Sequence, residues 1–371
     1  MTVCAIVHPD GLPTLLSDVL VSIVGQKLTT PSQLGWNQGK SEELSPLMRK
    51  SFVLPQQTAA FAFSGSVERI LQFTENFPLQ FQNRSQGEAS PMEVAGVIVD
   101  AFNSDNAWPN PSDDDRIGLL GFCRSESDGK LGINLVRDLS KQSIQTKYFK
   151  GVSAIGSGAG AVLNDIAIFD DQIDQNIALS DHVFTTSESR LNGLLGALNA
   201  KMLFVRMGDL VSDTWGGYIE ATTLVDYAEF SPAESWSHLA YVTQVGASEP
   251  SIEQFGKQVH YHRSASWSGL GVRLEDRQGN VGQVSIPIQD FPASGQPNDS
   301  GVLDWSTFSP ENVTLTIYFS ETGMVVHRTL HHDEHKFLVQ QGLMNWGLQS
   351  KFVEDICARA LSVFGNAKLQ E

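Results

Sequence analysis

The chain has few cysteines. Its 371 residues include only three, Cys4, Cys123 and Cys357, which lie far apart and form no Cys-x-x-Cys pair. An odd number of widely spaced cysteines supports neither a disulfide framework nor a zinc ribbon. The count favours a reducing compartment, and we expect no cofactor and no metal.

Basic residues and long apolar runs are also scarce. Lysine and arginine total 25 against 42 acidic residues, which gives a formal net charge of -17. Because nucleic-acid and anionic-membrane surfaces need clustered basic side chains, this balance argues against both kinds of partner. No apolar run approaches the roughly 20 residues that span a bilayer, and the first basic residue, Lys27, comes too late for a signal peptide. We therefore expect a cytoplasmic protein.

The sequence has no internal repeat and no low-complexity tract. With 41% hydrophobic and 18% charged residues, its composition is that of an ordinary globular protein. Because single hydrophobic cores stop growing near about 250–300 residues, the length predicts two units. A change in character near residue 230 divides the chain into a main domain, 2–230, and a C-terminal extension, 231–371.

Two hydrophobic periodicities alternate along the main domain. Runs bounded by turn residues predict strands, and apolar residues at helical spacing predict helices. The expected strands are 2–7, 12–17, 50–54, 59–64, 117–123, 131–136, 143–149, the start of 152–169 and 218–225, and the expected helices are 67–77, 91–102, the rest of 152–169 and 191–198. This order predicts an α+β sandwich with two central sheets and helices outside them.

The extension has a different pattern. A polar stretch after residue 230 is interpreted as a boundary, and two hairpins follow at 269–288 and 313–329. A final helix is predicted where apolar residues recur at helical spacing between Phe352 and Phe364. The extension is therefore predicted to be β-rich with a terminal helix.

Five residues of the main domain form an ordered set of candidate site residues. They are Thr2, Asp18 at the end of the first hairpin, Lys50 in MRKSF, Gly65 at the end of AAFAFSG, and Ser157 in AIGSGAG. Taken singly, each has an ordinary structural explanation, as a strand residue, a turn residue or a solvated charge. The functional hypothesis rests on their order.

In this order and context the chain resembles the N-terminal-nucleophile hydrolases of the proteasome β-subunit type, especially the bacterial proteasome homologues called Anbu. The resemblance covers roughly residues 2–225 and leaves the extension unexplained. It implies a four-layer αββα sandwich, threonine-type hydrolysis of a peptide or small amide substrate, and a homo-oligomer arranged as a ring or stack.

The chemistry of the set agrees with this resemblance. A threonine hydroxyl needs a base, and removal of Met1 would give Thr2 a free α-amine with a pKa near about 7.7–8.0. An ammonium from Lys50 would disfavour protonation of that amine, and a carboxylate from Asp18 would hold the lysine in place. The Gly65 N–H is the candidate donor to the oxyanion, and Ser157 is a candidate to fix the amine or a hydrolytic water.

The sequence also departs from the family pattern. Leu20 stands where the family usually has an arginine, and Trp215 stands where it usually has a serine. Asp213 is the candidate for the family's late aspartate. These departures favour an alternative function, a catalytically degraded assembly or binding subunit whose extension is an interaction module.

Histidines in the extension raise the possibility of a metal site. The candidate ligands are His260 and His262 on one strand, and His327, His331, His332 and His335 in HRTLHHDEH. His331 and His335 would be one helical turn apart if this segment began a helix, but it lacks the His-Glu-x-x-His order of zinc hydrolases. We interpret it as a solvated helix start, and Cys4 as a small core residue.

Overall fold

A computed structural model describes much of the chain. The described residues are 2–21, 28–34, 44–53, 59–66, 70, 96, 100, 117–124, 131–137, 141–179, 185–204, 216–225, 228–230, 234–243, 252–264, 268–276, 278–289, 308–320, 324–331 and 350–364. Within them the protein is a mixed α/β structure, with three sheets and the helices α3 (Ala159–Leu179), α4 (Ser187–Phe204) and α6 (Ser350–Phe364).

The first sheet holds the N-terminus at its centre. Its six strands, in spatial order, are β11 (Ala228–Phe230), β10 (Ile219–Val225), β2 (Thr14–Asp18), β1 (Val3–Val7), β9 (Gly151–Gly156) and β8 (Gln142–Gln145). The hairpin of β1 and β2 turns at Pro9–Gly11, where Asp10 and Gly11 have positive φ. The predicted opening hairpin is therefore confirmed.

A second sheet packs against the first. It consists of β4 (Ser51–Val53), β5 (Ala59–Gly65), β6 (Ile117–Arg124) and β7 (Leu131–Arg137), in that order. Between the two sheets lies one apolar cluster of Cys4, Ile6, Leu15, Ala60, Ala62, Leu120, Phe122 and Ile155. Alternate residues of β1 supply one face, as its period-two pattern predicts, and Cys4 is a core residue.

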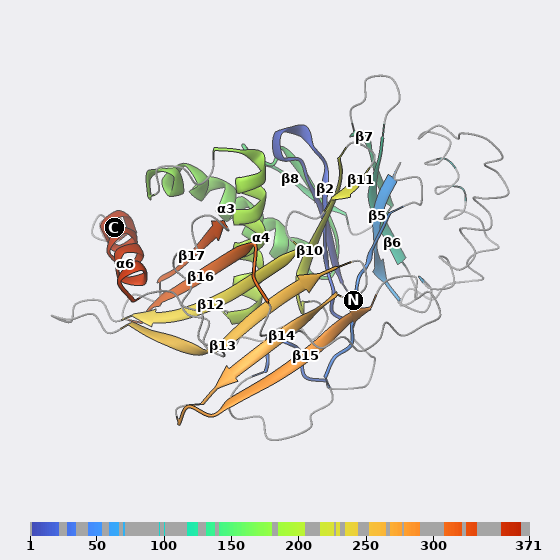
Figure 1. Ribbon diagram of the computed structural model, residues 1–371. Coiled ribbons are helices and arrows are strands. Elements are labelled where there is room, and N and C mark those ends of the chain that lie inside the picture. Colours follow the sequence, from blue (N-terminus) through green and yellow to red (C-terminus); the bar gives the residue numbers. More distant parts are fainter. Residues whose placement is uncertain are drawn as a thin grey trace.

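Helices α3 and α4 cover the other face of the six-stranded sheet (Figure 1). The remaining residues of β1 are Val3, Ala5 and Val7. They pack in one hydrophobic core with the apolar side chains of α3 and α4. The predicted helices 67–77 and 91–102 lie almost wholly outside the described residues. Within them, the single described residues Ile70, Gly96 and Asp100 are helical.

The third sheet contains most of the C-terminal extension. Its strands, in spatial order, are β17 (Met324–His331), β16 (Asn312–Phe319), β12 (Ser235–Thr243), β13 (Ile252–Arg263), β14 (Ser268–Glu275), β15 (Val281–Gln289) and β3 (Leu47–Met48). The edge strand β3 comes from the N-terminal part of the chain and runs parallel to β15. This sheet therefore joins the two predicted units.

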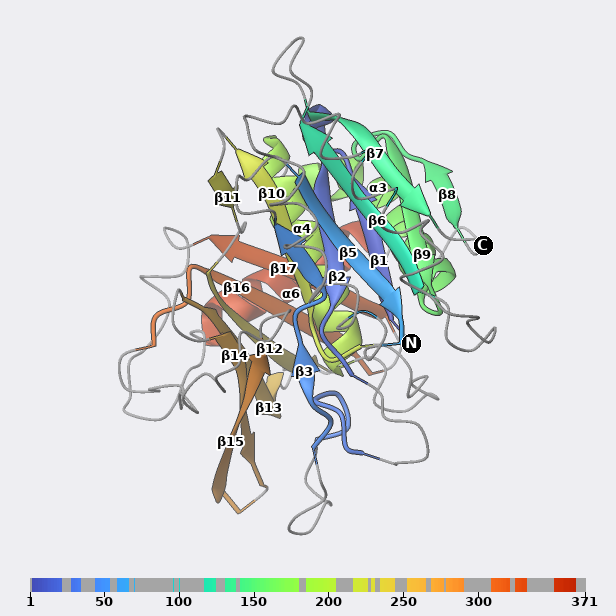
Figure 2. The ribbon, with the colours of Figure 1, turned by 90° about the vertical axis from the view of Figure 1, so that its right-hand side faces the viewer.

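Helix α4 lies between the six-stranded and seven-stranded sheets (Figures 1 and 2). It is buried around most of its circumference, which explains why its sequence has little amphipathic contrast. One hydrophobic core runs continuously from β1 through α4 to Trp236, Val259 and Leu270 of the third sheet. Helix α6 packs on the opposite face of that sheet, against Leu239, Leu315 and Leu330 among others. The division at residue 230 into separate units stays a prediction.

Two predictions of local structure were wrong. The strand predicted over 143–149 ends at Gln145, because the main-chain N–H groups of Lys147 and Tyr148 donate to the Asp170 carboxylate, at 2.7 and 2.8 Å. The segment predicted as a helix start at His331 is instead the end of strand β17. His332 and His335 lie outside the described residues.

The polar stretch interpreted as a boundary contains a central strand, β12. Its polar residues are buried rather than solvated: Ser237 shares a 2.7 Å hydrogen bond with His260, and the Trp236 indole donates to Thr314 at 2.8 Å. Because both faces of β12 are buried, its sequence shows no alternation. Hydropathy alone therefore indicated a surface segment.

Lys257 of β13 connects the third sheet to two other parts of the chain. Its buried ammonium donates to the main-chain carbonyls of Pro31 and Ser32, at 2.7 and 3.0 Å, and approaches that of Leu203 near the end of α4, at 3.5 Å. Burial lowers the pKa of Lys257 to about 7.

None of the helices among the described residues is long and apolar enough to cross a membrane.

The contact between α4 and the third sheet leaves no space for a side chain at Gly196, so a substitution there should lower stability. A Cβ atom there would lie 2.1 Å from Thr329 Oγ1 and 2.6 Å from Thr314 Oγ1. We expect Gly196→Ala to reduce the free energy of unfolding by about 1–3 kcal/mol in denaturant titrations. The matched control is Gly160→Ala in α3, whose Cβ would meet only the end of the Gln142 side chain, at 3.2 Å. Equal stability of the two variants would contradict this packing.

Lys257 predicts a pH dependence of stability above neutrality. Its folded pKa of about 7 lies below the ordinary value, so between the two values the unfolded chain binds more protons and stability rises with pH. The slope approaches about 1.4 kcal/mol per pH unit from this one group. We expect Lys257→Met to remove that slope between about pH 7 and 10, measured by urea unfolding. Parallel pH profiles of the two proteins would refute the assignment.

Candidate functional site

Thr2, Asp18 and Lys50, which we call the Thr2 cluster, meet in the interior of the protein. The Lys50 ammonium donates to Thr2 Oγ1, and also to Asp18 Oδ1 at 2.9 Å and to the Leu20 carbonyl at 2.6 Å. The Thr2 hydroxyl in turn donates to Asp18 Oδ1. The Asp18 side chain is fully buried and that of Lys50 is 7% exposed. The ammonium thus has an acceptor for each of its three protons.

The Asp18 carboxylate is held on both of its oxygens. Besides Thr2 and Lys50, the main-chain N–H of Val3 donates to Oδ1 at 2.9 Å, and that of Gly216 donates to Oδ2 at 2.8 Å. Such charge-assisted bonds fix the orientation of a buried carboxylate. The position of the Lys50 ammonium is thereby fixed too.

Lys50 lies where the chain passes from one sheet to another. Strand β3 of the seven-stranded sheet ends at Met48, and strand β4 of the four-stranded sheet begins at Ser51. The Lys50 carbonyl accepts from the Phe63 N–H of β5, at 3.2 Å. Because Lys50 lies at this junction between the sheets, its side chain can contact both the end of β2 and the start of β1.

Two glycines shape the surroundings of Thr2. Gly156, at the end of β9, has φ of +92°, and a Cβ there would lie 2.1 Å from the Thr2 carbonyl oxygen. The same Cβ would lie 3.4 Å from Cβ of Ser64, so the end of β5 is also close. Gly65, which ends β5, has φ of +114°, a conformation that favours glycine. Backbone from three strands thus converges beside Thr2.

Of the other two candidate residues, only Ser157 is among the described residues, and it makes no hydrogen bond to the Thr2 cluster. Ser157 follows Gly156 and is exposed, and its side chain has no hydrogen bond among the described residues. Asp213 lies outside the described residues, as does Trp215. Leu20, which stands where the resembled family has an arginine, packs its side chain in the core and contributes its carbonyl to Lys50.

A second, partly buried ion pair adjoins the cluster. Arg49 donates to both oxygens of Glu220, at 3.0 and 3.4 Å, and to the Ser268 hydroxyl at 3.0 Å. The Tyr261 hydroxyl donates to Glu220 at 2.8 Å. We call Arg49, Glu220, Tyr261 and Ser268 the Glu220 network. Sequence reasoning missed it, because only the adjacency of Arg49 to Lys50 could have pointed to it.

The network keeps Glu220 charged. Burial by itself would raise the pKa of this carboxyl, but the charge and hydrogen bonds of Arg49, with Arg263 and Tyr261, outweigh burial and lower the pKa below its ordinary value. The Glu220 side chain is 1% exposed. An ionised carboxylate at this depth is tolerated only because it is paired and hydrogen-bonded.

Two histidines of the third sheet, His238 and His260, are buried. Burial lowers the pKa of His238 and of His260 to about 3, so both rings are neutral at physiological pH. His238 shares a 3.1 Å hydrogen bond with the Tyr218 hydroxyl, and His260 pairs with Ser237. Among the residues that the structure describes, no three His, Cys, Asp or Glu side chains are grouped so as to hold a metal ion.

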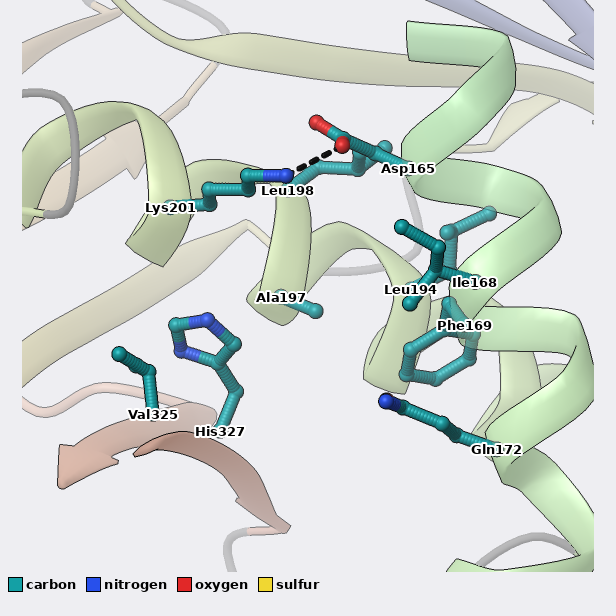
Figure 3. Close-up of a pocket in the computed structure, with 10 residues that line it drawn as sticks. All are labelled: Asp165, Ile168, Phe169, Gln172, Leu194, Ala197, Leu198, Lys201, Val325 and His327. Carbon is teal, nitrogen blue, oxygen red and sulfur yellow. Dashed lines mark hydrogen bonds and ion pairs between the residues drawn. The ribbon is translucent and has the colours of Figure 1, made fainter. Parts of the chain in front are cut away.

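A cavity of about 190 Å³ lies away from the cluster, between α3, α4 and β17 (Figure 3). Its walls are mainly apolar, and the ion pair of Lys201 and Asp165 lies on one side. His327 faces it from β17, with Nδ1 hydrogen-bonded to Thr316 at 3.1 Å. Its lining residues are Asp165, Ile168, Phe169, Gln172, Leu194, Ala197, Leu198, Lys201, Val325 and His327, none of which belongs to the Thr2 cluster.

Because Asp18 and Lys50 form a buried ion pair, we expect removal of the lysine charge to destabilise the protein strongly. We expect Lys50→Met to reduce the free energy of unfolding by about 3–5 kcal/mol, because it leaves Asp18 buried without its counter-charge. Lys141→Met, at an exposed lysine, is the matched control and should change stability little. Chemical denaturation measures both. If the two variants were equally stable, Lys50 would not be paired in the interior.

Among the solved structures that resemble the chain is a proteasome-related protein. The described fold is similar to Anbu (ancestral beta-subunit) from Yersinia bercovieri, with a TM-score of 0.37 and 11% sequence identity, over 62% of this chain and 86% of that chain. No protein-family model matches the sequence. No curated protein matches it either.

Proposed function

We propose that this protein is a threonine-type amide hydrolase whose nucleophile is Thr2 after removal of Met1. The observation that carries the proposal is the contact of the buried Lys50 ammonium with Thr2 Oγ1, in a cluster closed by Asp18. A buried cation hydrogen-bonded to a threonine hydroxyl stabilises negative charge on that oxygen. A purely structural threonine needs no such partner.

The reaction follows from these contacts. Thr2 Oγ attacks the carbonyl carbon of an amide while its proton passes to the free α-amine of the same residue. The carbon–nitrogen bond of the substrate then breaks, and the leaving amine takes that proton. This leaves an ester of the acyl group on Thr2. Water attacks the ester, again with the α-amine as base, and releases the carboxylic acid.

Lys50 and Asp18 act on the nucleophile. The Lys50 ammonium disfavours protonation of the nearby α-amine and stabilises the developing negative charge on Thr2 Oγ. Asp18 holds the ammonium in place through the bond of 2.9 Å. Gly65 is the proposed donor of an N–H to the oxyanion, since the preceding residue, Ser64, lies close to Gly156, which in turn packs against the Thr2 carbonyl. Ser157, which is exposed and follows Gly156, is the proposed residue to fix the α-amine or the hydrolytic water.

The proposal extends to architecture and assembly. A second helical layer from residues 67–102, over the four-stranded sheet, would complete the four-layer αββα sandwich. Peptides or smaller amides are the substrate class, and copies of the chain would associate as a ring or stack.

The test is covalent labelling of the N-terminus. We expect the intact mass to lack Met1, and a peptide epoxyketone or a β-lactone to add once, at Thr2. Thr2→Ala should abolish the adduct, and Thr2→Ser, which retains a hydroxyl, should keep it. The matched control is Thr14→Ala, which removes a hydroxyl from the same hairpin and should label normally. Peptide mapping by mass spectrometry locates the adduct.

Two outcomes would contradict the proposal. A retained Met1 blocks the α-amine and excludes the mechanism, and a processed chain without any adduct excludes a reactive Thr2. Either result would leave the alternative function, a non-catalytic assembly or binding subunit in which the Thr2 cluster is only a structural ion pair.

A further inference from the structure

The residues just before Lys50 are bonded to the C-terminal extension. Leu47 and Met48 pair with Ile288 and Gln289 of β15 in parallel register. The Arg49 N–H donates to the Gln289 carbonyl at 2.8 Å. The backbone that leads into Lys50 is therefore an edge strand of the third sheet.

The Arg49 side chain adds a second attachment to the same sheet. Through the Glu220 network it contacts Ser268 of β14 directly, and Tyr261 of β13 through the Glu220 carboxylate. Tyr261 also stacks on Tyr218, with ring centroids 4.6 Å apart and planes 9° from parallel. The planar guanidinium is thus fixed by partners on two sheets.

The two adjacent cations bind two acidic residues of the six-stranded sheet. Ile219 of β10 pairs with Asp18, and the next residue, Glu220, pairs with Ser17. Asp18 forms an ion pair with Lys50, and Glu220 forms one with Arg49. A shift of the Arg49–Lys50 segment along β10 would therefore break both ion pairs together.

We propose that strands β13–β15 of the extension, acting through the Glu220 network, are the positioning device that holds the Lys50 ammonium against Thr2. In this account Arg49, Tyr261 and Ser268 are positioning residues, and the extension is a part of the site's scaffold. The proposal rests on the proposed function for its catalytic consequence. Its geometric part, the placement of Lys50, stands by itself.

Mild variants test it in the full-length chain. Tyr261→Phe removes the hydroxyl that binds Glu220, and Ser268→Ala removes the acceptor for Arg49. The matched control is Tyr318→Phe, in β16 of the same sheet, whose hydroxyl has no hydrogen bond among the described residues. All three variants keep the backbone pairing of the sheet.

The first readout is independent of any reaction. The amide protons of Val3 and Gly216 both donate to Asp18, so their hydrogen exchange reports the geometry of the cluster. We expect faster exchange at both sites in Tyr261→Phe and Ser268→Ala, with no change at the core amide of Ile317 and no change in Tyr318→Phe. Unchanged exchange at Val3 and Gly216 in both variants would overturn the proposal.

The second readout is the rate of labelling at Thr2 by a β-lactone. We expect the maximal rate, kinact, to fall about three- to tenfold in Tyr261→Phe and Ser268→Ala, while the half-saturating concentration is unchanged. A fall in binding alone, or wild-type kinact in both variants, would contradict the positioning role. If the wild-type chain does not label, the proposed function fails, and the exchange readout still decides the placement of Lys50.

Discussion

The buried ion pair of Asp18 and Lys50 is the interaction on which the rest of the structure depends. Two opposite charges removed from water are stable only when every donor and acceptor is used. Here the ammonium has three acceptors, and the carboxylate has four donors from three parts of the chain, namely Thr2 and Val3, Lys50, and Gly216. The start of β1, the end of β2, the junction before β4 and the segment before β10 must all meet at one point.

The Glu220 network extends this constraint to the C-terminal extension. A second ion pair, of Arg49 and Glu220, ties the third sheet to the same junction, because Arg49 precedes Lys50 and Glu220 follows Ile219, the β10 partner of Asp18. Together with the edge strand β3 and the continuous core around α4, it connects the extension to the site. The third sheet thus contacts the segment that leads into Lys50.

Much of this arrangement could be predicted from the sequence, and the exceptions have physical causes. The alternation in β1 and the order of Thr2, Asp18 and Lys50 indicated which residues meet. The donors and acceptors from Gly216 and Leu20 are main-chain groups, which leave no mark in side-chain patterns. Strand β12 was missed because its serines and histidine are buried in hydrogen bonds. In the Glu220 network, Arg49 and Glu220 are 171 positions apart, beyond any local periodicity.

The most direct measurement of the central claim is the nuclear magnetic resonance of the Lys50 ammonium in chain labelled with nitrogen-15 at lysine. A buried ammonium with three acceptors should show slowly exchanging protons and nuclear Overhauser contacts to the Thr2 γ-methyl group. Loss of these contacts in Asp18→Asn would agree with the ion pair. A Lys50 signal that exchanges as fast as that of exposed Lys141, with no contact to Thr2, would contradict the account.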